Sequence, residues 1–169
     1  MSSGTDDETI HAIGRSIMRW QDATQDFDEA FGRLHGLSSP ERRCLGLIVF
    51  GHQTARAIAS ETGLTPASIT ALLDRLEARG LLSRQPDPND RRKIMVSITR
   101  KAQVMAEDAY GPIHREGVAL LEGYSAAERE IVLRFVTGAV EMQNRLTAEF
   151  LARHAGKKAE TERPGQSGA

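Results

Sequence analysis

The sequence has little of several features that mark other classes of protein. It holds one cysteine in 169 residues, so no disulfide can form within the chain. Aromatic residues make up only 5% of it, so a core must be mainly aliphatic. Its longest apolar stretch, residues 44–50, is far shorter than the ~20 residues that cross a bilayer, and its first residues are acidic where a secretory signal is basic. We therefore expect a cytoplasmic protein with no membrane partner.

Metal and catalytic patterns are also missing from the sequence. The five histidines show no ligand spacing and there is no cysteine pair, so we expect no metal and no cofactor. There is no glycine-rich phosphate loop, and the serine, histidine and aspartate residues stand where capping or solubility explains them. We therefore do not expect an enzyme.

Composition and periodicity divide the chain into five segments. We expect a flexible acidic leader over residues 1–7 and a disordered tail, rich in lysine, glutamate, glycine and serine, over 153–169. Between them we expect a long helix over 8–36, a compact module over 37–99, and two further helices over 100–152, the first kinked or broken at Gly111-Pro112.

The first long helix carries an apolar seam at alternating steps of three and four residues. Its members are Ile10, Ile13, Ile17, Trp20, Thr24, Phe27, Phe31 and Leu34. Such a seam fits a helix that packs on its own core and equally one that packs against a second subunit. For Trp20, a core or interface position is favoured over the lining of a ligand pocket.

Residues 54–79 predict two short helices joined by a tight turn. Gly63 supplies the turn, Thr65 is a good N-cap, and Pro66 takes the first helical position, where its missing N–H does no harm. One face of the second helix is apolar, through Ile69, Leu72, Leu73 and Leu76. The opposite face has small or hydrogen-bonding side chains, which can approach base edges in a major groove. The pair therefore indicates a helix-turn-helix.

Residues 81–99 predict a β-hairpin with a connection over 86–90 that is dense in turn-forming residues. Residues 75–101 include eight basic and three acidic side chains, whereas the net charge of the whole chain is −1. A basic loop of this kind can place a guanidinium in a minor groove and ammonium groups on phosphates.

The run over 37–99 resembles the bacterial MarR (multiple antibiotic resistance regulator) family. The resemblance rests on Asp-Arg-Leu-Glu at 74–77 with Gly-Leu at 80–81, on Asp-Pro-Asn-Asp-Arg-Arg at 87–92, and on the Ile-Thr ending at 98–99. It implies a mainly α fold with a small β-hairpin wing, in which a winged helix-turn-helix is flanked by N- and C-terminal dimerisation helices.

The resemblance also implies roles for individual residues. In the recognition helix the residues placed at DNA are Thr65, Pro66, Ser68, Thr70 and Arg75. In the wing they are Asp90, Arg91, Arg92 and Lys93. Arg92 inserts into the minor groove, Asp90 holds it, and Asp74 is a further partner of that arginine.

From this resemblance we expect a homodimeric regulator that binds double-stranded DNA as a ligand-responsive repressor. A two-fold dimer should recognise a pseudo-palindromic operator with half-site centres ~10 bp apart. The resemblance also implies a small aromatic or anionic effector, bound between the dimer helices and the winged module. The sequence does not settle repressor against activator.

Two other functions stay open. The first is a winged-helix protein-interaction module that has lost DNA binding, against which the Arg-Arg-Lys tip at 91–93 argues. The second is an oxidant sensor acting through Cys44. That thiol lies in an apolar run, where a free cysteine usually behaves as a small buried hydrophobe.

Overall fold

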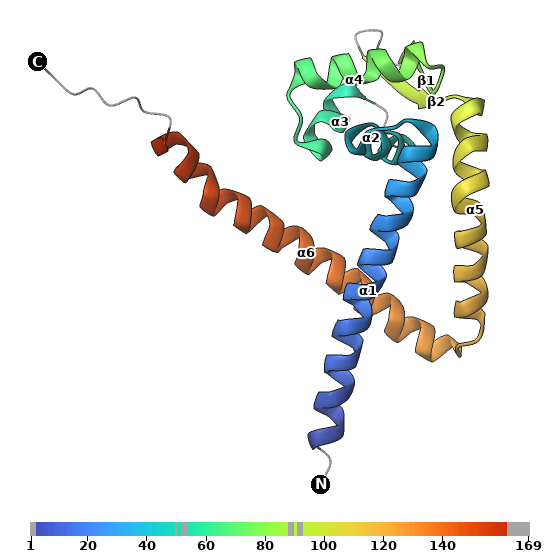
Figure 1. The fold of residues 1–169 in the computed structure, drawn as a ribbon, viewed down its shortest axis with the longest axis vertical. Coiled ribbons are helices and arrows are strands. Elements are labelled where there is room, and N and C mark those ends of the chain that lie inside the picture. Colours follow the sequence, from blue (N-terminus) through green and yellow to red (C-terminus); the bar gives the residue numbers. More distant parts are fainter. Residues whose placement is uncertain (1–2, 50, 52–53, 88–89, 91–92, 162–169) are drawn as a thin grey trace, which may run out of the picture. The chain divides into compact units, whose positions relative to one another are not determined.

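The computed structural model describes residues 3–49, 51, 54–87, 90 and 93–161, and these form helices and one two-stranded antiparallel sheet (Figure 1). The elements are α1 (Ser3–His35), α2 (Ser39–Val49), α3 (Ala55–Thr62), α4 (Pro66–Ala78), β1 (Leu82–Pro86), β2 (Ile94–Ile98), α5 (Arg100–Glu122) and α6 (Ala126–Thr161). A mainly helical chain with one hairpin confirms the expected fold class. The chain forms two compact units, residues 1–112 and 113–169.

Both ends of the helical region extend further than expected. Helix α1 already begins at Ser3, so residues 3–7 of the expected leader are helical. Asp7 and Glu8 lie near this N-terminus, where negative charge is favourable to the helix dipole. Helix α6 continues to Thr161, past the expected boundary at 153, because the alanine, lysine and glutamate residues there are good helix formers.

Helix α5 passes through Pro112 without the expected break. Proline removes a single backbone donor, and the remaining hydrogen bonds of this 23-residue helix keep it continuous at that position. The boundary between the two compact units nevertheless falls directly after Pro112.

The core of the first unit lies between α2, α3, α4 and the hairpin. Its most deeply buried side chains are Cys44, Ile58, Ile69, Leu72, Leu73, Leu76, Leu82 and Val96. The apolar face predicted for α4 is therefore confirmed as the side that packs inward. Burial of each such aliphatic side chain stabilises the fold by roughly 1.5–3 kcal/mol.

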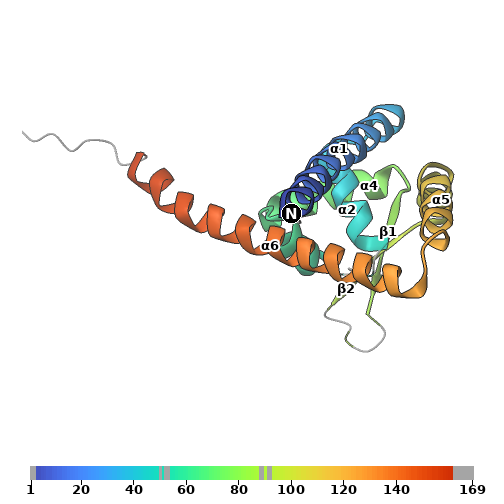
Figure 2. The same ribbon diagram turned by 90° about the horizontal axis from the view of Figure 1, so that it is seen from below.

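The hairpin pairs β1 with β2 in the register Leu82↔Ile98 to Pro86↔Ile94 (Figure 2). On its inner face Leu82 and Val96 are buried in the core, while Ile94 at the outer end is exposed. The hairpin is thus anchored at its base by apolar contacts, and its far end extends beyond them.

Candidate nucleic-acid interface

The helix-turn-helix is closed by local capping, as the sequence predicts. Gly63 ends α3 in the left-handed conformation with φ of 68°. Thr65 then accepts a hydrogen bond from the backbone N–H of Ser68 over 3.2 Å, with Pro66 in the first turn of α4. At the other end of α4, Gly80 has φ of 67° and donates its N–H to the carbonyl oxygen of Glu77. These caps fix both ends of the candidate recognition helix.

The outer face of α4 is exposed, and two of its hydroxyl groups are already engaged within the helix. The Thr65 and Ser68 hydroxyl oxygens lie 2.9 Å apart, and Thr70 donates its hydroxyl proton to the Pro66 carbonyl over 3.0 Å. The alanines at 67 and 71 add no bulk to this face. The exposed face of the N-terminal half of α4 therefore carries only small side chains, so another molecule can approach the helix closely.

Arg75, one turn further along, is oriented by a side chain of α2. Its Nε lies 3.4 Å from Oε1 of Glu41, and 58% of the arginine side chain stays exposed. Glu41 also accepts hydrogen bonds of 2.8 Å from the backbone N–H and the hydroxyl of Ser38, the contacts by which a capping-box glutamate caps the start of α2. Burial raises the pKa of Glu41, but the Ser38 hydrogen bonds and the Arg75 charge together lower it below the ordinary value. Glu41 is thus held as a carboxylate beside Arg75.

Arg84 in β1 joins the wing to the recognition helix, and the sequence analysis did not identify it. Its Nη1 lies 2.6 Å from Asp74 Oδ1 and 3.1 Å from Glu77 Oε2, and its Nη2 donates to the Thr70 carbonyl over 3.4 Å. Asp74 is therefore bonded to Arg84. The expected contact of Asp74 with Arg92 lies outside the described residues. The acidic residues at 74 and 77, one turn apart on α4, were the sequence signal for such a partner.

The wing connection is closed by residues on either side of its tip. The Asp87 N–H donates to the Lys93 carbonyl over 2.9 Å, and the Lys93 N–H donates to the Asp90 carbonyl over 2.8 Å. The Lys93 ammonium lies 3.6 Å from the Asp90 carboxylate. Arg91 and Arg92 lie outside the described residues, so the predicted Asp90–Arg92 contact stays a prediction.

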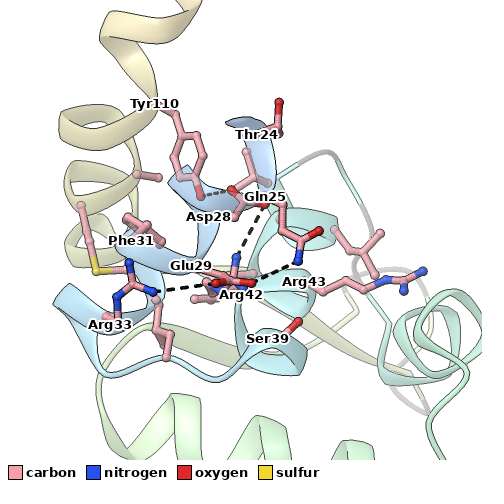
Figure 3. Close-up of a pocket in the computed structure, with 18 of the residues that line it drawn as sticks. Thr24, Gln25, Asp28, Glu29, Phe31, Arg33, Ser39, Arg42, Arg43 and Tyr110 are labelled. Atoms are coloured by element: carbon pink, nitrogen blue, oxygen red, sulfur yellow. Dashed lines mark hydrogen bonds and ion pairs between the residues drawn. The ribbon is translucent and has the colours of Figure 1, made fainter. Parts of the chain in front are cut away.

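A cavity of about 1370 Å³ lies beside the winged module, lined by α1, α2, β2 and the first half of α5 (Figure 3). Trp20 is one of its lining residues, and at 65% exposed it is not part of the core of this chain. Tyr110 donates its hydroxyl proton to Asp28 over 2.8 Å, and Asp28 lies 3.6 Å from Arg42. Burial and the Asp28 carboxylate raise the pKa of Tyr110 to about 12.

The guanidinium end of Arg42 is packed against α1. Its Nε is buried and has no hydrogen-bond partner within the part of the chain that the structure describes. The side chain lies against the backbone of α1, where a Cβ on Gly32 would come within 2.8 Å of that nitrogen. The sequence analysis missed Asp28, Arg42 and Tyr110, since no spacing along the chain connects them.

Known proteins match this architecture. Residues 35–93 match a family model described as MarR family. An HTH-type transcriptional regulator of Bacillus subtilis strain 168, YcgE, is 34% identical over 92 residues, which is 54% of this chain. Residues 35–93 therefore form a MarR-family module. The matched part spans 60% of the length of the Bacillus protein.

Several solved structures share the fold. The regulator Tm0710 from Thermotoga maritima is 21% identical, with a TM-score of 0.56 over 82% of this chain and 98% of its own. RV1404 from Mycobacterium tuberculosis is 18% identical, with the same TM-score over 80% and 94%. A variant of S. aureus MepR bound to an oligodeoxyribonucleotide is 19% identical, with a TM-score of 0.52 over 79% and 97%.

The match of the winged module to a family of transcriptional regulators agrees with the expectation of a non-enzymatic protein. Over the described residues no cluster of histidine, cysteine, aspartate and glutamate could hold a metal ion. None of the helices, as far as they are described, is long and apolar enough to span a membrane.

Cys44 lies fully buried in the core of this MarR-type module. Burial, with a smaller contribution from the Glu41 charge, raises the pKa of its thiol to about 11. Because the thiolate is the reactive form, this environment suppresses oxidation of Cys44. The oxidant-sensor alternative has no support from this geometry.

Proposed function

We propose that the chain is a homodimeric, ligand-responsive repressor of transcription in the bacterial cytoplasm, which binds double-stranded DNA through α4 and the wing. The observation that carries the proposal is the exposed N-terminal face of α4, which carries only small side chains. A helix of this form can reach base edges in the major groove, and its dipole favours a phosphate. The match of residues 35–93 to the MarR family and the oligonucleotide bound to the MepR variant support the same function.

The residues of α4 that we assign to DNA are Thr65, Pro66, Ser68, Thr70 and Arg75. Thr70 has already donated its hydroxyl proton to Pro66, so it offers a methyl group and a lone pair. Arg75 keeps an exposed guanidinium that Glu41 holds in place. Arg75 therefore suits a phosphate or a guanine edge, while Thr70 suits a thymine methyl group.

The residues of the wing that we assign to DNA are Asp90, Arg91, Arg92 and Lys93. Arg92 enters the minor groove in this proposal, and Lys93 contacts the phosphate backbone. Asp90 closes the connection around them through its contact with Lys93. Asp74 orients the wing from α4.

Exposed apolar side chains support the dimer. In α1 they include Ile10, Ile13, Trp20 and Leu34. In α6 they include Ile131, Phe135, Met142, Leu146 and Phe150. Long helices with such seams are stable mainly when the apolar side is covered. We propose that a second copy of the chain covers both seams and places two recognition helices on a pseudo-palindromic operator.

The cavity beside the winged module is the proposed effector site. The aromatic side chains of Trp20 and Phe31 line it, and so does the cationic side chain of Arg42. These features suit a small aromatic or anionic molecule. A ligand there touches α1, α2 and α5 at once, so it can favour an arrangement of these helices that releases DNA.

A gel-shift experiment tests the DNA-binding proposal. The probe is the DNA upstream of the protein's own gene, at two salt concentrations, with wild type, Arg92→Ala and the matched control Arg19→Gln in α1. We expect wild type and control to bind equally and to weaken steeply with salt. Arg92→Ala should bind more weakly, because it loses the guanidinium that we assign to the minor groove. If wild type prefers this probe no more than a scrambled duplex, the protein-interaction alternative is favoured.

A thermal-shift screen of small aromatic acids tests the effector site. A ligand that binds only the folded protein raises the melting temperature. The shift should disappear in Arg42→Gln and persist in Arg56→Gln, which removes the same charge from an exposed position of α3 that does not line the cavity. An equal shift in both variants would place the ligand elsewhere.

A further inference from the structure

The side chain of Arg84 makes three contacts with α4. It reaches Asp74, Glu77 and the Thr70 carbonyl, which span two turns of α4, and only 25% of its side chain is exposed. A guanidinium presents its donors in a fixed plane, so contacts with several acceptors on one helix fix the direction of the side chain. Lysine could supply the charge but not this geometry.

The position of Arg84 in the hairpin explains why these contacts matter for the wing. It stands two residues after Leu82 on the same face of β1 and pairs with Val96 of β2 in the strand register. Leu82 and Val96 are both buried in the core. The base of the hairpin is therefore held by apolar packing on its inner face. Further along the same face, Arg84 forms ion pairs with α4.

We propose that Arg84 is a positioning residue that sets the angle of the wing relative to the recognition helix, an inference that rests on the DNA binding proposed above. Arg84 does not contact DNA in this account. It acts through Asp74 and Glu77, and it also balances two carboxylates that would otherwise repel phosphates from α4.

The same contacts contribute little to stability. Both carboxylates are substantially exposed, and exposed ion pairs usually add little to the free energy of unfolding. Loss of Arg84 should therefore change wing position and DNA affinity much more than the melting temperature.

A double-mutant cycle tests the inference. The variants are Arg84→Gln, the double variant Asp74→Asn with Glu77→Gln, and all three changes together, with Arg19→Gln as the control for loss of one positive charge. Affinity is measured by fluorescence anisotropy on the upstream DNA. We expect Arg84→Gln to lose roughly tenfold in affinity, and to cause less than about a twofold further loss in the double variant. Arg84→Lys should not restore binding.

Hydrogen exchange without DNA supplies a second readout. In Arg84→Gln the amides of residues 82–85 and 94–98 should exchange faster than in wild type, while those in the interior of α2 should not change. If wild type binds no DNA, the proposed function fails and this exchange alone decides whether Arg84 holds the wing. An equal loss of affinity in both backgrounds, rescue by lysine, or unchanged exchange would overturn the inference.

Discussion

Arg79 at the C-terminal end of α4 donates a hydrogen bond of 2.6 Å from Nη2 to the carbonyl oxygen of His35 at the end of α1. Its Nη1 donates to the carbonyl of Gly36 over 2.9 Å. The Lys101 ammonium in α5 in turn donates to the Arg79 carbonyl over 2.9 Å. The ends of three helices thus meet at one arginine, which connects the proposed recognition helix with α1.

Replacing Arg79 with alanine should destabilise the first unit. The change leaves two carbonyl oxygens at the end of α1 without their charged donor, and hydrogen bonds to charged groups contribute roughly 1.5–3 kcal/mol each before solvent replaces them. Because the site is partly exposed, we expect a net loss of about 1–2 kcal/mol in the free energy of unfolding, measured by urea denaturation. Arg33→Ala, which removes an exposed arginine from the same end of α1, should change it by less than about 0.5 kcal/mol.

The capping box at the start of α2 should make stability depend on acid pH. Hydrogen bonds from Ser38 and the charge of Arg75 outweigh the effect of burial and hold the pKa of Glu41 below its ordinary value of 4.5. A group whose pKa is lowered by folding stabilises the protein above its unfolded value, and this contribution is lost as pH falls through the folded value.

The free energy of unfolding should therefore fall more steeply between about pH 5 and about pH 3 in wild type than in Glu41→Gln. The glutamine variant should be less stable at neutral pH, because the Arg75 contact loses its charge partner. Glu61→Gln in α3 is the exposed control with the same change of charge. Parallel curves for wild type and Glu41→Gln would contradict the assignment.

Local and distant contacts differed in how far the sequence could predict them. The caps at Thr65 and Gly63 involve residues within a few positions of each other, and the sequence predicted both. The hairpin and the inner face of α4 follow from periodicity over one element. Arg79 and His35 are 44 residues apart, and no local pattern connects them.

The candidate interface shows the same division. The recognition helix and the basic wing were visible because composition and spacing mark them over short ranges. Arg84 was not, because its role depends on how β1 packs beside α4. Asp28 and Tyr110 are 82 residues apart and meet only when α1 and α5 pack together.

Tyr110 should give a late step in the titration of tyrosine absorbance. Burial and the hydrogen bond to Asp28 raise its pKa from 10.0 to about 12. A raised folded value means that the contribution of this group to stability is complete below the unfolded value of 10.0 and is lost as pH rises toward about 12.

Tyr110→Phe should remove that late step. It should also lower the free energy of unfolding near neutral pH by about 1 kcal/mol, the usual contribution of one hydrogen bond. Above pH 10 the difference between wild type and variant should shrink. A late step that survives in Tyr110→Phe would show that it belongs to another group.

The apolar seam of α6 should determine the oligomeric state. Phe135 is 49% exposed in this chain, and Ile131 lies one turn before it on the same seam. A charge at this position would have to be buried without a partner if a second copy covers the seam, and leaving a buried charge unpaired is strongly destabilising. We therefore expect wild type to sediment as a dimer and Phe135→Asp to sediment as a monomer.

Arg134→Asp is the matched control, because it introduces the same aspartate at the adjacent exposed position of α6 and should leave the dimer intact. The monomer should also bind a pseudo-palindromic duplex no better than a single half-site, because only a dimer engages both halves together. Circular dichroism should show that Phe135→Asp keeps the helices of the winged module. A variant that stays dimeric would assign the subunit contact to other side chains, and equal dissociation of the control would indicate that charge alone separates the subunits.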